Sequence, residues 1–109
     1  MSLRTDYTGG LDTAINEAIA AGIAFGTTNN VAIASALTDA AALGQTTVSY
    51  SAVEAHNPAG IILQGNIYNA YKSGLIRYFA DQDIMYSELA FSVSSVDGSS
   101  NQVTVTFTF

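Results

Sequence analysis

The chain has 109 residues, enough for one domain; 49% of them are hydrophobic, only 11% are charged, and the formal net charge is −6. Its three cations, Arg4, Lys72 and Arg77, cannot neutralise a run of phosphates, so the sequence predicts neither a nucleic-acid partner nor an anionic membrane partner. The absence of cysteine excludes disulfides, thiolate chemistry and cysteine-ligated metals. The first residues are too polar for a signal peptide and no apolar run reaches about 18 residues, so we expect a soluble protein made in a cytoplasm.

The first half of the chain predicts two helices separated by a break. The first, over residues 11–25, has an apolar residue at every fourth position, namely Leu11, Ile15, Ile19 and Ile23. Gly26 is its expected end, and after the break Asn30 is the expected N-cap of a second helix over residues 31–43. Gly44 is the expected end of that helix. Two such helices form an antiparallel helical hairpin.

The middle of the chain predicts one strand and one long helix. Residues 45–55 favour extended backbone, with Val48, Tyr50 and Ala52 on one face. Asn57 followed by Pro58 is a helix-start signal, and the helix is expected to run over residues 59–80. One face of that helix gathers a stripe of large side chains, namely Leu63, Ile67, Tyr71, Leu75 and Tyr78.

The end of the chain predicts a β-hairpin, with strands over residues 83–96 and 102–109. The apolar residues of both strands fall on odd numbers: Met85, Leu89, Phe91 and Val93 in the first, and Val103, Val105, Phe107 and Phe109 in the second. Facing residues of antiparallel strands share a face, so the loop must contain an odd number of residues. A two-residue turn at Asp97 and Gly98 would set Phe91 against Thr104. We therefore expect a loop of three or five residues with Gly98 in the left-handed region.

The order helix, helix, strand, helix, strand, strand predicts an α+β fold with a small antiparallel sheet covered by helices on one face. No internal repeat or linker interrupts the sequence, so residues 1–109 are expected to form a single domain. A sheet this small exposes at least one edge strand, and the chain has few charges with which to protect it. This combination favours strand pairing between subunits.

Catalytic and metal-binding patterns are weak. His56 is the only histidine, and no glycine-flanked serine accompanies it, so an enzyme built on His56 ranks last among the alternatives. Asp81 and Asp83, with Glu88 further on, could in principle bind a divalent cation, but their spacing fits a polar turn better than a calcium loop. We therefore predict no enzymatic activity, no cofactor and no metal.

Tyrosines and the C-terminal strand supply the candidate contact residues. Tyrosine is favoured at protein interfaces, although packing at the margin of the core is the simpler explanation. A strand that runs to Phe109 without a polar tail requires cover from this domain or from another subunit. The candidate interface residues are Tyr68, Tyr71, Tyr78, Tyr86, Val105, Phe107 and Phe109.

The stretch from Ala14 to Thr47 is rich in Ala, Thr and Asn, and threonine alternates with apolar residues up to Phe109. In these features, and in its acidity and lack of cysteine, the chain resembles the small structural subunits of tailed phages, marine ones in particular. The resemblance implies a homo-oligomer that acts by association, with other virion proteins as further partners, in a neck, tail or capsid-decoration role. The alternative is a small ligand-binding domain with a pocket between the long helix and the sheet, where Gly65 and Gly74 would leave room.

Overall fold

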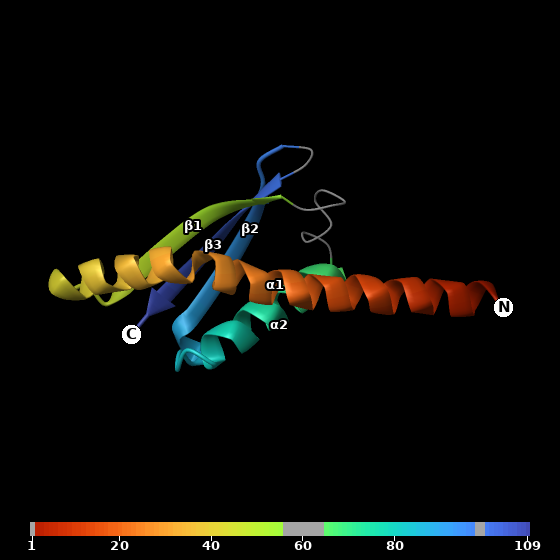
Figure 1. Cartoon of the computed structure of the whole chain (residues 1–109), viewed down its shortest axis with the longest axis horizontal. Coiled ribbons are helices and arrows are strands. Elements are labelled where there is room, and N and C mark those ends of the chain that lie inside the picture. Colours follow the sequence, from red (N-terminus) through yellow and green to blue (C-terminus); the bar gives the residue numbers. More distant parts are fainter. Residues whose placement is uncertain (1, 56–64, 98–99) are drawn as a thin grey trace.

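A computed structural model describes residues 2–55, 65–97 and 100–109. The elements are α1 (Leu3–Ala42), β1 (Thr47–Ala55), α2 (Gly65–Ala80), a short 3-10 helix η2 (Tyr86–Glu88), β2 (Leu89–Ser95) and β3 (Ser100–Thr108). The three strands form an antiparallel sheet in the order β1-β3-β2, and the two helices cover one of its faces (Figure 1). The predicted α+β class and one-sided helical cover are confirmed.

The predicted N-terminal helical hairpin is wrong, because α1 is one continuous helix of 40 residues. The expected stop at Gly26 is instead a contact with α2: a Cβ atom there would lie 2.2 Å from the ring of Tyr78. Asn30 does not cap a helix, since its amide nitrogen donates to the Tyr78 hydroxyl at 2.6 Å. The residues that suggest a break are thus used for packing between the two helices.

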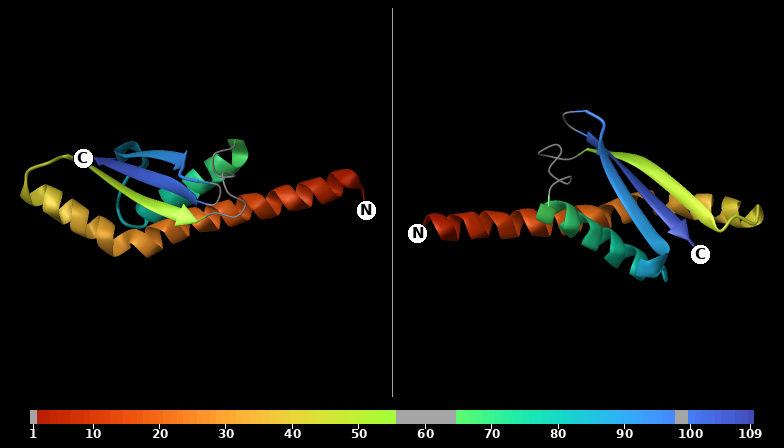
Figure 2. Two further views of the ribbon diagram at one scale, coloured as in Figure 1. Left: turned by 90° about the horizontal axis from the view of Figure 1, so that it is seen from above. Right: turned by 180° about the vertical axis from the view of Figure 1, so that it is seen from behind.

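Side chains in the middle of α1 bond back to the helix itself. The Thr27 hydroxyl donates to the Ile23 carbonyl at 3.1 Å, and the Asn29 amide donates to the Phe25 carbonyl at 2.8 Å. Such bonds to the preceding turn tend to bend a helix, and Figure 2 shows α1 changing direction in its middle. The polar stretch that predicted a break therefore bends the helix without ending it.

The end of α1 is the one the sequence predicts. Gly44 has φ +73°, its amide donates to the Ala41 carbonyl at 3.0 Å, and the Gln45 amide donates to the Ala40 carbonyl at 3.0 Å. This pair of bonds is a Schellman motif, in which the glycine adopts the left-handed conformation at low cost. β1 follows at once and lies within the predicted strand over 45–55.

The helix predicted over residues 59–80 is described from Gly65 to Ala80. Its expected start at Asn57 and Pro58 lies outside the described residues, as does His56. The far end of α2 repeats the closure of α1, with an aspartate in place of glycine. Asp83 has φ +63°, and the Ile84 amide donates to the Phe79 carbonyl at 3.0 Å.

The strand predicted from residue 83 begins only at Leu89. The left-handed residue Asp83 turns the chain, and the Glu88 carboxylate accepts from the Met85 amide at 2.8 Å, which holds residues 85–88 in a tight turn. Met85, expected on the buried face, is therefore exposed.

The hairpin register agrees with the sequence argument. Phe91 pairs with Val105 and Val93 pairs with Val103. Ser95 pairs with Asn101, so the loop between them, residues 96–100, has an odd number of residues, as predicted. The expected conformation of Gly98 lies outside the described residues.

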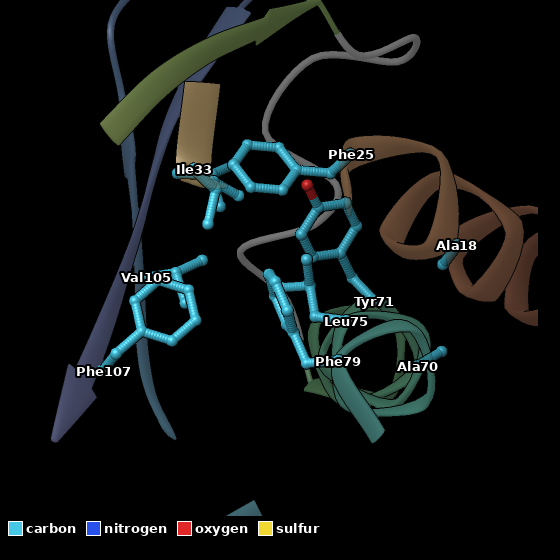
Figure 3. Close-up of a cluster of buried hydrophobic side chains, with 10 residues drawn as sticks. Ala18, Phe25, Ile33, Ala70, Tyr71, Leu75, Phe79, Val105 and Phe107 are labelled. Carbon is cyan, nitrogen blue, oxygen red and sulfur yellow. The ribbon is translucent and has the colours of Figure 1, made fainter. Parts of the chain in front are cut away.

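The core lies between the helices and the central strand β3. Val103, Val105 and Phe107 are completely buried there, and Phe107 meets the ring of Phe79 edge-on with centroids 5.3 Å apart (Figure 3). The strands on either side are less covered: Tyr50 on β1 and Phe91 on β2 are half-buried. Burial therefore falls from the centre of the sheet toward both edges.

The two helices pack closely through glycine. A Cβ atom on Gly22 would lie 2.3 Å from the Tyr71 carbonyl oxygen, and one on Gly74 would lie 2.1 Å from the Ile19 carbonyl oxygen. Gly74 thus allows α1 to approach α2 and does not leave room for a ligand against the sheet. Gly65, the other glycine of that prediction, has open space around it.

Candidate functional site

Three of the predicted contact residues are core residues. Val105 and Phe107 are fully buried under the helices, and Tyr71 is 2% exposed. Their surfaces are used within the chain, so another subunit could reach them only if the core opened. The alternation of β3 identified the buried stripe correctly, but sequence could not tell whether the stripe is covered by the chain's own helices or by a neighbour.

The other predicted contact residues lie nearer the surface. Tyr86 is 70% exposed and Phe109 is 55% exposed, and the Phe109 ring stacks on Phe107 with centroids 6.3 Å apart. Tyr68 is half-buried, with the Lys72 ammonium 4.8 Å from its ring centroid. Tyr78 is half-buried between the helices, where its hydroxyl accepts from Asn30. The predicted contact surface remains open for Tyr68, Tyr86 and Phe109.

The N-terminal end of α1 is a surface that the sequence prediction missed. Every residue from 3 to 10, called the arm below, is exposed, and Figure 1 shows this end of α1 projecting beyond α2 and the sheet. Leu3 is 89% exposed and Tyr7 is 67% exposed. The four-residue spacing of Leu3, Tyr7, Leu11 and Ile15 places them on one helix face. Ile15 packs against the core, so the apolar stripe runs from the core onto the free arm. Starting the predicted helix at Leu11 concealed this stripe.

A shallow groove runs between α2 and β2. Its volume is about 360 Å³. It is lined by Asn69, Lys72, Ser73, Ile76, Tyr86, Leu89, Ala90 and Phe91. Lys72 is the one charged residue among the described residues of this lining, and the exposed Tyr86 lies in η2, just before the start of β2. The groove is therefore lined both by Tyr86, a predicted contact residue, and by β2, an edge strand of the sheet.

A cluster of polar side chains from four elements lies at one end of the core. Tyr50 donates to the Asn29 carbonyl oxygen at 2.9 Å, and the Asn29 amide contacts the Glu54 carboxylate at 3.4 Å. Glu54 pairs across the sheet with Asn101, which is completely buried and whose carboxamide has no hydrogen-bond partner among the described residues. The Tyr71 hydroxyl is likewise buried without a partner in the described part of the chain. Burial, with a smaller contribution from the negative charge of Glu54, raises the pKa of Tyr71 above its usual range.

The acidic turn after α2 has a structural explanation. Asp83 terminates the helix, and Glu88 bonds to the backbone of η2. Within the described residues, no group of three histidine or acidic side chains comes close enough to hold a metal ion. The described part of the chain also contains no helix long and apolar enough to cross a membrane.

Comparison with known proteins gave no relationship. Neither a family model, nor a curated protein, nor a solved structure matches this chain.

Proposed function

We propose that this protein is a non-enzymatic structural subunit that associates with copies of itself, as a virion or assembly component of a tailed phage. The observation that carries the proposal is the arm of α1, where Leu3 and Tyr7 extend a core-forming stripe into open space. A protein that functions alone gains nothing from holding such a stripe away from its own core. A second copy could cover it by the same packing that α2 provides further along α1.

The composition of the arm strengthens this argument. Gly9 and Gly10 lie within it, and, apart from the neighbouring backbone of α1, no described residue comes within 4 Å of a Cβ atom built on either of them. Each glycine costs about 1 kcal/mol relative to alanine in a helix, and short unsupported helices are marginal in water. Helical structure over these residues is favoured once a partner covers the apolar face.

Light scattering at several protein concentrations tests the proposal. We expect an oligomer for the natural chain and a smaller mass when Leu3 and Tyr7 are both replaced by Gln. Val31→Gln is the matched control, because Val31 is 81% exposed on the same helix but lies outside the arm. A natural chain that stays monomeric at every concentration would contradict self-association.

The virion role rests on the resemblance to tailed-phage subunits. It predicts that the protein sediments with purified virions of its source and is detected there by mass spectrometry at a stoichiometric level. Recovery only from the soluble lysate, with none in the particles, would argue against a virion component while leaving self-association unaffected.

The groove between α2 and β2 favours a second candidate, a small ligand-binding domain. Its volume of about 360 Å³ and its mixed lining suit a small molecule with one anionic group near Lys72. This candidate predicts a monomer that copurifies with a ligand. Native mass spectrometry compared with denaturing mass spectrometry would reveal the additional mass.

A further inference from the structure

The two edges of the sheet differ in their protection. β1 ends near Glu54, an inward-pointing and half-buried charge, and Tyr50 ties the strand to α1 through Asn29. Inward-pointing charges are one of the devices by which proteins block pairing at a sheet edge. The sequence of β2, Leu-Ala-Phe-Ser-Val-Ser-Ser, contains neither a charge nor a proline. β2 is therefore the unprotected edge, and it is seen along its length in Figure 2.

The hairpin hydrogen bonds show which backbone groups of β2 face outward. The Val96 amide donates to the Ser100 carbonyl at 3.1 Å, so the even-numbered residues of β2 point their backbone groups toward β3. The amides and carbonyls of Phe91, Val93 and Ser95 therefore point to the free side, together with the Leu89 carbonyl. The Leu89 amide is already used, because it donates to the Tyr86 carbonyl of η2. The remaining groups offer the bonding pattern of an antiparallel strand.

We propose that β2 pairs antiparallel with β2 of a second copy, about a two-fold axis through Ser92, to make one six-stranded sheet. This inference rests on the proposed self-association and adds a second contact surface to the arm. Full overlap of the strand sets Phe91 opposite Val93 of the second copy, an aromatic and β-branched pair of the kind that stabilises sheets. On the other face Ser92 meets Ser92 of the second copy, as Ser49 already meets Thr106 within the chain at 2.9 Å.

Burial and charge agree with this pairing. Phe91 and Val93 are half-buried, although their neighbours Val105 and Val103 on β3 are completely buried. A fourth strand beside β2 would cover them as β2 covers β3. The pairing surface itself is uncharged, and the nearest cation in the groove, Lys72, is held over the ring of Tyr68 on α2.

A single cysteine tests the register directly, because the chain has no natural cysteine. Around the two-fold axis, residue 92 forms a non-hydrogen-bonded pair with Cα atoms about 4.5 Å apart, a separation that a disulfide can bridge. Ser92→Cys should therefore convert to a disulfide-linked dimer under mild oxidation. Ser94→Cys is the matched control on the same exposed face. Its two copies would lie about 14 Å apart at roughly 3.4 Å per residue, beyond the reach of a disulfide.

A charge exchange provides the second measurement. Ser92→Lys and Ser92→Glu should each reduce the mass seen by light scattering, and an equimolar mixture should restore it. Ser51→Lys, on the exposed face of β1, should leave the mass unchanged, and circular dichroism would verify that each variant is folded.

Rapid cross-linking of Ser92→Cys without cross-linking of Ser94→Cys supports the pairing. Equal cross-linking of both cysteine variants, or an unchanged mass for both charged variants, overturns it while the arm-dependent oligomer still supports the proposed function. A monomeric natural chain overturns both.

Discussion

The close approach of α1 and α2 predicts that Gly74→Ala destabilises the protein although alanine is the better helix former. The added methyl would lie 2.1 Å from the Ile19 carbonyl oxygen and 3.1 Å from the Gly22 Cα. Both are backbone atoms, which cannot rotate away as a side chain could. Ordinary contacts lie at 3.4–4 Å, so the two helices must separate on the order of 1 Å. That movement also loosens Leu75 and Phe79, which fill the core beside Gly74.

The magnitude follows from two opposing effects. Overpacking a tight contact costs typically about 1–3 kcal/mol, and more when the backbone cannot yield. The helix preference of alanine offsets about 1 kcal/mol of this. Because backbone on both sides prevents an easy relaxation, the upper end of this cost applies, and we expect a net loss of about 2 kcal/mol in the free energy of unfolding. For a domain of this size, each 1 kcal/mol lowers the melting temperature by roughly 4 °C or more.

Urea unfolding followed by far-ultraviolet circular dichroism measures this change at one protein concentration. The midpoint should fall without a change in slope. Gly9→Ala is the control: it makes the same chemical change on the exposed arm, where no atom lies within 4 Å of the new Cβ. That variant should keep its midpoint and gain helical signal. If Gly74→Ala unfolded at the natural midpoint or above it, the inferred close contact between the helices would be refuted.

Further changes in stability are expected at Tyr71, Asp83, Gly44 and Tyr78. Because the Tyr71 hydroxyl is buried without a partner among the described residues, Tyr71→Phe should keep or raise stability in urea. Burial and Glu54 raise the pKa of Tyr71, so the folded state retains a proton that the unfolded state loses, and the natural chain should lose stability as the pH rises above about 10. Tyr71→Phe should lack that part of the loss, and equal alkaline profiles would contradict the assignment. Asp83→Gly should raise the free energy of unfolding by up to about 1 kcal/mol, and Gly44→Ala should lower it by a similar amount, since both positions have positive φ. Tyr78→Phe should cost about 1 kcal/mol because Asn30 loses its hydrogen-bond partner; an unchanged urea midpoint would count against that bond.

The strands were more predictable than the helices because their signals are local. Alternation along 102–109 identified the buried face of β3, and the parity argument required Phe91 to face an apolar residue of β3, which in the structure is Val105. The glycines of α1 led to a wrong prediction of the helix end because Gly22 and Gly26 are used for helix packing. Each lies against α2, a segment about 50 residues away in sequence. No periodicity within α1 contains that information.

The candidate contact residues, too, were predictable only where the signal is local in sequence. Apolar residues of β3 were correctly predicted to need cover, but the helices of the same chain supply it. The helical periodicity placed Tyr71 within the apolar stripe of the long helix, but it could not show whether the same chain or another subunit covers that stripe. The fold buries Tyr71 beneath the sheet and leaves Tyr86 at the start of β2. The arm was missed because Gly9 and Gly10 suppress the helix signal there.

The low charge of the chain has two explanations, and the structure separates them. The outer face of the sheet is made mostly of hydroxyl side chains, some of which bond to one another, as in Ser51 and Thr104 at 2.8 Å, so this face meets water without charges. Scarcity of charge alone is therefore no argument for association. Val53 is an exposed apolar residue on this face, but other large apolar side chains left exposed lie elsewhere, among them Leu3 and Tyr7 on the arm and Tyr86 beside the β2 edge. Since burying these surfaces needs no charge and leaves the hydroxyl face free, a sheet continued through β2 would remain soluble on its outer side, and association would stop at the two-fold partner unless the arms bring in further copies.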